Sequence, residues 1–329
     1  MQYLIDNFFS LTMTGISLGA VYALVALGYT LVYGVLRLIN FAHSEVFMYG
    51  TFAALWVVMA LGGHSGASVP AVIGWIAAMF IAAMVTSGAI AVGLERFAYR
   101  PLRKRNAPAL IALISAIGAS FVLAELMGLR DKLFAVVGLD RALDAYVGRA
   151  RNNAGLPEIL TPKPVFPLFD YEVTNVDILV VVGAIVMMVV LDQFVQRSRL
   201  GRGIRAVAQD AEAAALMGVN RDRVIQVTFL VGGVMAGVAA ALYMLRIGIT
   251  RYDAGFLLGV KAFTAAVLGG IGNLRGALVG GFVLGLAENY GSAIVGTQWK
   301  DVVAFVLLVV ILLFRPTGLL GESLGRARA

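Results

Sequence analysis

Long apolar runs constrain the fold of this chain more than any other feature of its sequence. Several extend for about 20 residues with almost no charge, and a helix of that length crosses a hydrocarbon layer roughly 30 Å thick. Of the 329 residues, 60% are hydrophobic and 14% are charged, and the mean hydropathy is +0.89, far from the balance of a soluble domain. The alternation typical of membrane β-strands does not occur. The sequence therefore predicts an all-α, polytopic membrane protein.

The apolar segments also set the expected number of crossings. Those at 46–61 and 259–271 are short and border Gly, Asn and charged residues, so each is a candidate half-helix. We expect about eight to ten transmembrane helices, some of them broken. If every segment crosses, the N-terminus is external. We treat residues 1–329 as one membrane domain. The segments lie at 8–36, 46–61, 69–94, 108–129, 178–195, 224–247, 259–271, 276–297 and 302–314.

Basic residues are concentrated in three places, and this fixes the expected orientation. The positive-inside rule puts such clusters in the cytoplasm, and topology anchoring alone accounts for most of these arginines. The net charge of +7 therefore does not indicate nucleic-acid binding. The C-terminus is expected to be cytoplasmic. The clusters comprise Arg96, Arg100, Arg103, Lys104 and Arg105; Arg197, Arg199, Arg202, Arg205, Arg221 and Arg223; and Arg315, Arg326 and Arg328.

The longest polar part of the chain is expected on the other side of the membrane. An even number of crossings separates the basic loops at 96–105 and 197–223, so the connection at 130–177 is external. It contains Pro157, Pro162, Pro164 and Pro167. A loop of this length is either an inert connector or a docking surface.

Residue types that the chain lacks exclude several kinds of chemistry. The absence of cysteine excludes disulfides and thiol catalysis. The two histidines, His43 and His64, are too few to suggest a catalytic metal centre. No Gly-Lys-Ser or Gly-Lys-Thr element is present, so ATP, if it powers the protein, binds elsewhere. We expect that this chain is not an enzyme and that it binds neither a cofactor nor a metal. Residues 1–9 carry no Lys or Arg, unlike a signal peptide.

A short Ala-rich stretch in the basic loop at 197–223 is the most informative local pattern. Asp210 is placed to cap a helix that begins at Ala211, and Gly218 to end it in a left-handed turn. Glu212 lies in the first turn, where the helix dipole favours negative charge. The pattern suits a helix that lies in another protein's groove, and the alternative is an ordinary cytoplasmic helix. Its other candidate contact residues are Ala213, Ala214, Leu216 and Met217.

Two stretches break the pattern of a lipid-facing helix. The first lies at 40–45, after Arg37, and the second at 268–276, preceded by Lys261. A pair of interrupted segments on either side of an external loop suggests two structural halves and points to a transporter's central path. The alternatives are a membrane–water boundary for the first stretch and close helix packing for the second. The candidate path residues are Asn40, His43, Ser44, Glu45, Gly269, Gly270, Gly272 and Asn273.

Two further acidic residues lie within or beside apolar segments. Glu125 is expected near the outer surface, because Arg130 and Asp131 follow within two turns. Glu288 is interpreted as an interhelical polar contact, with a functional role as the alternative.

The sequence resembles a known transporter family. The spacing in 212–218 is similar to the cytoplasmic coupling motif of bacterial ABC-importer permeases, although the stretch at 228–231 lacks the proline that usually ends it. Stretches at 18–24, 38–45, 110–118, 261–272 and 315–318 resemble the LivH-type permease of branched-chain amino-acid ABC importers. The likeness runs from about residue 15 to residue 318 and is weakest in the external loop. Ser44 departs from the family pattern, in which Gly is expected.

The resemblance implies a transport subunit that works by alternating access. Its partners would be a second, related permease, two ABC ATPase subunits that bind ATP and magnesium, and an extracytoplasmic solute-binding protein. The implied cargo is leucine, isoleucine or valine, with urea or a short-chain amide as the alternative within the family. An ion-coupled secondary transporter is a less favoured alternative because few charged pairs lie deep in the segments. A scaffold without transport would leave the interrupted segments unexplained.

Overall fold

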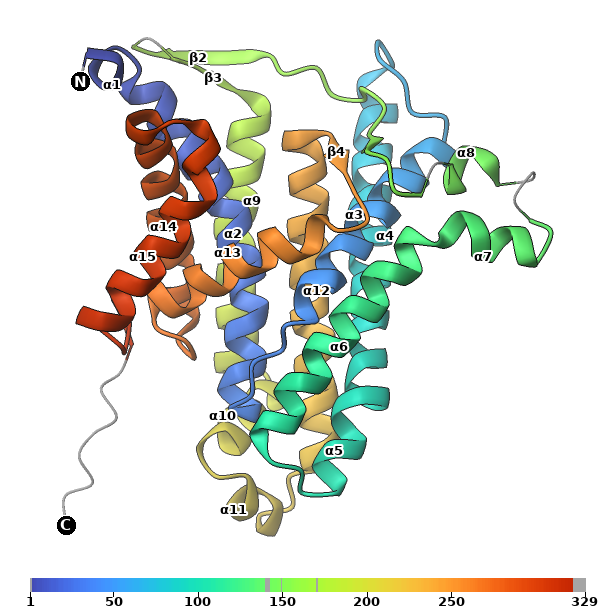
Figure 1. The fold of residues 1–329 in the computed structure, drawn as a ribbon, viewed down its shortest axis with the longest axis vertical. Coiled ribbons are helices and arrows are strands. Elements are labelled where there is room, and N and C mark those ends of the chain that lie inside the picture. The colour runs from blue at the N-terminus through green and yellow to red at the C-terminus, as the bar shows by residue number, and fades with distance from the viewer. Residues whose placement is uncertain (1, 140–142, 149, 170, 322–329) are drawn as a thin grey trace. The chain divides into compact units, whose positions relative to one another are not determined.

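The computed structural model describes residues 2–139, 143–148, 150–169 and 171–321, and it is almost entirely helical (Figure 1). The basic residues Arg326 and Arg328 lie outside these ranges. The helices are α1 (Gln2–Asp6), α2 (Phe8–Leu36), α3 (His43–Ala60), α4 (Val69–Leu94), the π-helix η1 (Glu95–Tyr99), α5 (Arg100–Lys104), α6 (Ala109–Gly128), α7 (Arg130–Val136), α8 (Asp144–Val147), α9 (Asn175–Arg197), α10 (Arg199–Gln209), α11 (Ala211–Leu216), α12 (Arg221–Ile247), α13 (Ala254–Gly269), α14 (Leu274–Val295), the 3₁₀-helix η2 (Thr297–Trp299) and α15 (Lys300–Phe314).

Seven helices in the described part of the chain are long and apolar enough to cross a membrane. They correspond to α2, α4 with its continuation to Lys104, α6, α9, α12, α14 and η2 with α15. The two segments predicted to be short form α3, which has 18 residues and a polar first turn, and α13, which has 16 residues. The prediction of an all-α polytopic protein is confirmed.

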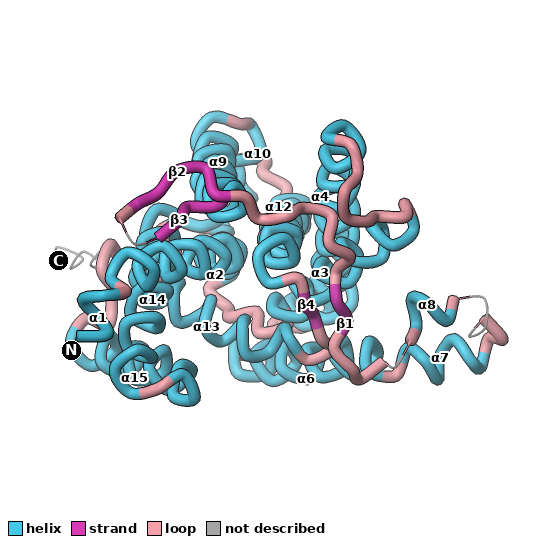
Figure 2. The backbone as a smooth tube through the Cα atoms, turned by 90° about the horizontal axis from the view of Figure 1, so that it is seen from above, coloured by secondary structure: helices cyan, strands magenta, loops and turns pink. Residues whose placement is uncertain are grey.

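The strands form two separate antiparallel pairs (Figure 2). In one pair, β1 (Ala154–Gly155) lies beside β4 (Ile249–Thr250). In the other, β2 (Pro164–Leu168) forms a hairpin with β3 (Tyr171–Thr174). Most of this structure belongs to the loop predicted to be external, which also contains α7 and α8. The loop therefore has secondary structure of its own.

The helices pack into two compact units that interleave along the chain. The first unit contains residues 1–37, 162–228 and 260–329, and the second contains residues 38–161 and 229–259. This division differs from the predicted halves on either side of the external loop, because each unit takes helices from both sides of that loop. The chain passes from one unit to the other within α12 and again within α13.

The first unit is built around α2. In the most apolar 18-residue stretch of this helix, 89% of the residues are buried. Helix α14 approaches it closely because glycines face each other along the contact. A Cβ atom on Gly281 would lie 2.5 Å from Ala23, and one on Gly285 would lie 2.2 Å from the carbonyl oxygen of Gly15. Small residues allow such close backbone approach in membrane helices. At these two positions the contacts fit close helix packing, which the sequence left open beside a role in the path.

The second unit is built around α3, which packs against α4 and the later part of α12. Phe47 and Phe52 of α3 are fully buried. Glycines again set the spacing, since a Cβ atom on Gly237 of α12 would lie 2.5 Å from the carbonyl oxygen of Ala83 in α4. The Ser87 hydroxyl of α4 donates a hydrogen bond of 2.9 Å to the Val46 carbonyl of α3. The polar first turn of α3 is thereby held inside the unit.

Candidate functional site

The predicted helix in the basic loop is present as α11, with both expected caps. The Asp210 carboxylate accepts hydrogen bonds of 2.9 Å from the backbone N–H groups of Glu212 and Ala213. At the other end Gly218 has φ +84°, and its N–H bonds to Ala215 while that of Val219 bonds to Ala214. This pair of bonds is the Schellman arrangement, which satisfies the last carbonyls of a helix. The capping prediction is therefore confirmed.

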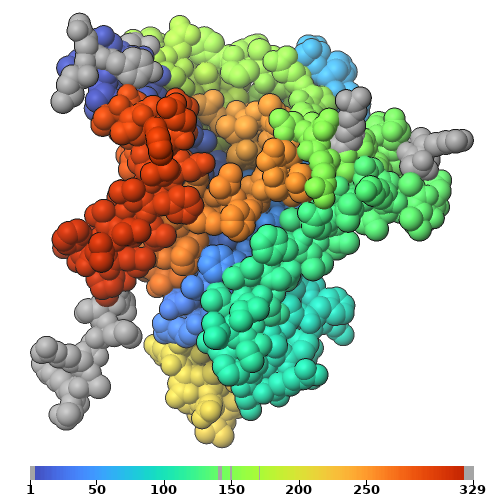
Figure 3. Space-filling model, in the orientation of Figure 1, coloured from blue at the N-terminus to red at the C-terminus, as the bar shows by residue number. Residues whose placement is uncertain are grey.

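Helix α11 presents its apolar side chains to the surroundings. Leu216 is 89% exposed and Met217 is 84% exposed, whereas Ala214 is buried. The segment forms part of the surface of the first unit and is visible in yellow at the bottom of Figure 3. These two neighbouring side chains are a candidate contact surface for another protein.

Helix α11 is fixed to the membrane part of the first unit through α10. The Arg205 guanidinium of α10 donates hydrogen bonds of 2.7 and 2.8 Å to the carbonyls of Val195 and Gln196 at the end of α9. The Ser198 hydroxyl caps α10 by accepting from the Gly201 N–H at 2.8 Å. A Cβ atom on Gly201 would lie 2.3 Å from the Val195 carbonyl oxygen, so only glycine permits this approach. The α9–α10–α11 segment is thus connected by direct polar contacts.

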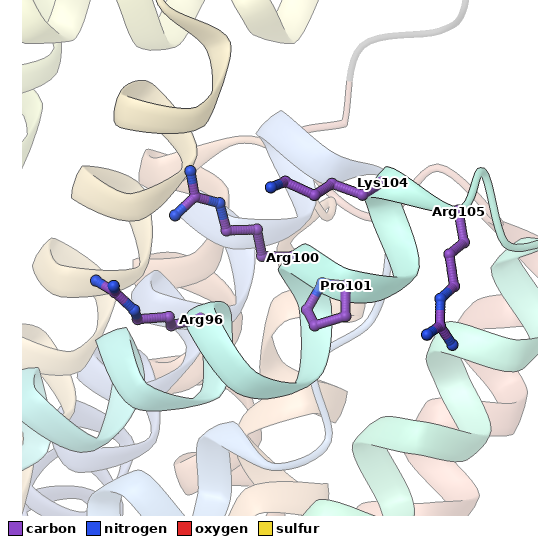
Figure 4. Close-up of a pocket in the computed structure, with 5 residues that line it drawn as sticks. All are labelled: Arg96, Arg100, Pro101, Lys104 and Arg105. Atoms are coloured by element: carbon purple, nitrogen blue, oxygen red, sulfur yellow. The ribbon is translucent and has the colours of Figure 1, made fainter.

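The first basic cluster lies on the continuation of α4 in the second unit. Arg96, Arg100 and Lys104 follow each other at intervals of four residues, and their side chains extend to one side while Arg105 points elsewhere (Figure 4). They border a surface pocket of about 390 Å³. Another arginine of the cluster, Arg103, pairs with the buried Glu95 at 3.0 Å. The position at the end of an apolar helix suits the predicted anchoring role.

The first candidate path stretch, at 40–45, is buried in the second unit. Asn40, His43, Ser44 and Glu45 are each at most 3% exposed. The side-chain oxygen of Asn40 accepts a hydrogen bond of 2.9 Å from Tyr99, and the Ser44 hydroxyl donates 2.7 Å to the Phe41 carbonyl. These contacts hold the turn that precedes α3.

Glu45 is the most unusual side chain of this stretch. The Ser120 hydroxyl of α6 donates a hydrogen bond of 3.1 Å to Oε1, and Oε2 has no hydrogen-bond partner in the described part of the chain. Gly255 at the start of α13 packs directly against this group, since a Cβ atom there would lie 2.6 Å from Oε2. A buried carboxylate with an unused oxygen is a candidate for contact with a polar solute.

The second candidate path stretch forms the tight turn between α13 and α14 in the first unit. A Cβ atom on Gly269 would lie 1.9 Å from the Gly276 carbonyl oxygen, while Gly270 and Gly272 have φ angles of +104° and +101°. The Asn273 side chain caps α14, accepting from Arg275 at 3.0 Å and donating 2.8 Å to the Leu320 carbonyl. Packing and turn geometry account for these residues, and a role in the path remains a prediction.

The two candidate stretches belong to different units. The structure brings residues together within each stretch. Asn40, His43, Ser44 and Glu45 gather at the start of α3. Gly269, Gly270, Gly272 and Asn273 gather at the α13–α14 turn.

Sequence reasoning missed the polar partners of Glu288. This carboxylate is fully buried, accepts a hydrogen bond of 2.7 Å from Tyr22 and pairs with Lys261. The Lys261 ammonium also pairs with Asp301 at 2.6 Å. The interpretation of Glu288 as an interhelical contact is confirmed. The signal that could have found its partner is the single lysine within an apolar segment, because a buried charge requires an opposite one.

Two other acidic residues have structural partners. Glu125 is about half exposed and pairs with Arg151 at 2.7 Å, as expected of a residue near the surface. Asp177, which the sequence reasoning did not single out, is fully buried at the start of α9. It accepts hydrogen bonds of 2.9 Å from Ser17 and from Tyr171. Asp177 thus joins α2 and the β2–β3 hairpin to α9.

Comparison with known proteins identifies relatives over nearly the whole chain. Residues 11–312 match the family described as branched-chain amino acid transport system, permease component. The chain is 41% identical over 313 residues to the high-affinity branched-chain amino acid transport system permease protein BraD of Pseudomonas aeruginosa, covering 94% of both chains. It is 40% identical to the LivH proteins of Escherichia coli and Salmonella typhimurium, over 316 and 311 residues respectively, again covering 94% of both chains. No solved structure matches.

These relatives are transport permease subunits rather than enzymes, and the match extends from α2 to α15. It includes both interrupted stretches and α11. The chain belongs to the family of permease components of branched-chain amino acid transport systems.

Proposed function

We propose that this chain is the membrane-spanning permease subunit of an ATP-driven ABC importer for leucine, isoleucine and valine. The relatives named for branched-chain amino acid transport support this cargo in preference to urea or a short-chain amide. The subunit is a multi-pass protein of the bacterial inner membrane. Its C-terminus is cytoplasmic, and residues 1–329 act as a single permease domain. The chain itself binds no nucleotide, and ATP with magnesium is bound by partner subunits.

The observation that carries this proposal is the capped helix α11 with its exposed apolar side chains. Leu216 and Met217 are almost fully exposed in a loop that lies, by its arginines, on the cytoplasmic side. Exposure of both side chains to water is unfavourable, since burying one large apolar side chain contributes about 1.5–3 kcal/mol. An ATPase groove that covers α11 would bury them. We assign the coupling role to Asp210, Glu212, Ala213, Ala214, Leu216, Met217 and Gly218.

The contacts of α10 provide a route by which movement of α11 reaches the membrane helices. Arg205 connects α10 to the end of α9, and Asp177 at the other end of α9 is bonded to Ser17 of α2. When the ATPase pair closes on ATP, displacement of α11 is transmitted to α9 and α2. The access path, which we assign to the residues at 40–45 and 269–273, then opens to one side of the membrane at a time.

The complete transporter contains subunits besides this one. We propose a heterodimer with a second, related permease, two ABC ATPase subunits on the cytoplasmic side and a solute-binding protein on the external side. The binding protein supplies most of the selectivity. The permeases provide a passage of low affinity, because tight binding within the path would slow release of the solute.

The experiment that tests the proposal is uptake by the complex of both permeases and the ATPases in proteoliposomes. With liganded binding protein outside and ATP inside, we expect accumulation of leucine that persists when ion gradients are dissipated. Urea and short-chain amides should not compete. Accumulation that requires an ion gradient but not ATP would instead establish secondary transport.

A matched pair of variants tests the role of α11 within that assay. Leu216→Ser with Met217→Ser should assemble normally but lose most solute-stimulated ATP hydrolysis, because the groove contact is removed. Arg202→Ala, an exposed change on neighbouring α10, should retain stimulation. Equal stimulation in the two variants would remove α11 from the coupling surface.

A further inference from the structure

A pocket of about 320 Å³ lies at the end of the second unit where α6 ends, one helix length from the basic cluster that precedes α6. One wall is apolar and comes from α3, and the other is polar and comes from α7 and the segment leading to β1. The apolar wall consists of Leu55, Trp56 and Met59, and the polar groups are Arg130, Asn152 and Asn153. If the basic cluster is cytoplasmic, the pocket is on the external side.

Arg130 is the unusual member of this pocket, because it is a cation only 6% exposed. Its Nε donates 2.9 Å to the Val147 carbonyl, and its Nη1 donates to the carbonyls of Met127 and Ala150 at 3.1 and 2.7 Å. The guanidinium carbon lies 4.8 Å from the centre of the Phe52 ring. The remaining nitrogen, Nη2, makes no hydrogen bond in the described part of the chain, and it is not fully buried. One donor group of a fixed, buried fork is therefore left for a ligand.

The charge of Arg130 is not balanced by an ion pair with any carboxylate of the described residues. Its three acceptors are neutral carbonyls, and nearby Glu125 is already paired with Arg151. Burial lowers the pKa of the Arg130 guanidinium, and neighbouring Asp131 acts in the opposite direction. A buried cation without an anion is unfavourable, and an anionic group that reaches it forms a charge-assisted hydrogen bond.

The pocket also has the size and rigidity of a small-molecule site. Ligand pockets begin at about 300 Å³, which places this one at the lower end of the range. The Trp56 indole N–H donates 3.1 Å to the Tyr146 carbonyl, and this bond ties the apolar wall to the opposite segment. Another protein would need to insert a side chain into this space, whereas a free amino acid matches both of its walls.

We propose that this pocket is an external subsite that receives a branched-chain amino acid, with its carboxylate at Arg130 and its side chain against Leu55, Trp56 and Met59. The amides of Asn152 and Asn153 supply further polar contacts. The inference rests on the proposed function for the identity of the cargo. It assigns the subsite to solute released from the binding protein, before the solute reaches the access path.

The natural absence of cysteine makes a direct test possible. We would introduce Asn153→Cys into the complex with cysteine-free partner subunits, in nanodiscs and without binding protein, and measure the rate of its modification by a methanethiosulfonate reagent. Leucine at about ten times its dissociation constant should slow modification about tenfold. The matched control is His64→Cys, an exposed position in the loop after α3 of the same unit, where leucine should have no effect.

A ligand series identifies the role of the carboxylate without changing Arg130. 4-Methylpentanoate, which retains the carboxylate and lacks the ammonium group, should protect Asn153→Cys. Leucinamide, which retains the ammonium group and lacks the carboxylate, should not.

Arg130→Lys should abolish protection by leucine, and its circular dichroism and assembly would show whether the fold is retained.

Three outcomes would overturn the inference: no protection by leucine, equal protection by leucinamide, or, in a separate reaction to which the binding protein is added, protection by that protein alone. The last outcome would indicate a protein-docking surface. ATP-driven leucine uptake by the unsubstituted complex is measured separately with binding protein present. Failure of the uptake test therefore counts against the proposed function, and failure of protection with normal uptake counts against the subsite alone.

Discussion

The Tyr22 hydroxyl of α2 donates a hydrogen bond of 2.7 Å to the Glu288 carboxylate of α14, and Lys261 of α13 pairs with the same carboxylate. Three helices of the first unit thus meet at one buried acid. The charge of Lys261 is shared with Asp301, which lies at the start of α15 and is about half exposed. The cluster fixes the short helix α13 against its neighbours through charge as well as packing.

Removal of one charge from this cluster should cost more stability than removal of two. Lys261→Met leaves Glu288 buried without its cation, and breaking a buried pair in this way typically costs about 3–5 kcal/mol. The double variant Lys261→Met with Glu288→Gln has no buried charge at the pair and keeps an acceptor for Tyr22. We expect its thermal unfolding midpoint in detergent to lie above that of Lys261→Met alone.

Tyr22→Phe is the control for this comparison, because it removes a hydrogen bond and no charge. Its expected cost is about 1 kcal/mol. If the double variant unfolds at a lower temperature than Lys261→Met alone, the prediction is wrong.

The contact between α2 and α14 predicts a strong dependence on residue size at Gly281. A Cβ atom there would lie 2.5 Å from Ala23, so Gly281→Ala forces the helices apart, and overpacking of this kind costs about 1–3 kcal/mol. Gly281→Ile should prevent stable folding. Gly118→Ala and Gly118→Ile in α6 are matched controls, since no atom lies within 4 Å of a Cβ atom built there. The yield of monodisperse protein in detergent measures the difference, and equal losses at both positions would contradict the packing account.

Local sequence patterns predicted local structure well in this chain. The apolar segments correspond to helices because burial of backbone polar groups in lipid leaves few other choices. Asp210 and Gly218 became caps because their preferences are properties of the residues themselves. The interrupted stretches were located from Gly, Asn and charged residues, and those residues begin or end helices in the structure.

Relationships between distant segments could not be predicted in the same way. Glu288 was identified as an interhelical contact, but its partners Tyr22 and Lys261 are 266 and 27 residues away. The interleaved units arise because α12 and α13 each cross from one unit to the other, and hydropathy carries no information on helix neighbours. From the sequence, Arg130 served only to place Glu125 near the outer surface. In the structure its guanidinium is buried and donates hydrogen bonds to the carbonyls of Met127, Val147 and Ala150.

Substitutions at Gly218 should reduce solute-stimulated ATP hydrolysis to different extents. Its φ of +84° is disfavoured for side-chain-bearing residues, although nothing lies within 4 Å of a Cβ atom there, so the cost is one of backbone conformation. Asn tolerates this region best, and a β-branched residue costs about 1–3 kcal/mol. We expect solute-stimulated ATP hydrolysis to fall slightly in Gly218→Asn, further in Gly218→Asp, and to be lost in Gly218→Val.

Glu212→Lys tests the same helix through charge. It places a cation near the N-terminus of α11, where the helix dipole favours an anion, and it changes the exposed surface while the caps remain. The permease should stay in the membrane and in the complex, and stimulated hydrolysis should be lost. Normal stimulation in both Glu212→Lys and Gly218→Val would show that α11 does not couple the ATPases to transport.

The environment of Glu45 predicts that transport is more sensitive than assembly to change at the start of α3. Its Oε1 is bound by Ser120, whereas its Oε2 has no hydrogen-bond partner in the described part of the chain. Glu45→Gln keeps the shape and the acceptor for Ser120 but replaces the carboxyl group with a neutral amide. If the unused oxygen contacts the passing solute, leucine uptake by Glu45→Gln should fall at least about tenfold, the equivalent of 1.4 kcal/mol, while assembly is unchanged.

His43→Ala should likewise lower uptake more than it lowers assembly. Ser120→Ala is the control, because it removes the structural hydrogen bond and leaves the carboxyl group; its uptake should fall much less than that of Glu45→Gln. Uptake that follows assembly in all three variants would mean that Glu45 holds α3 in place and does not act on the solute.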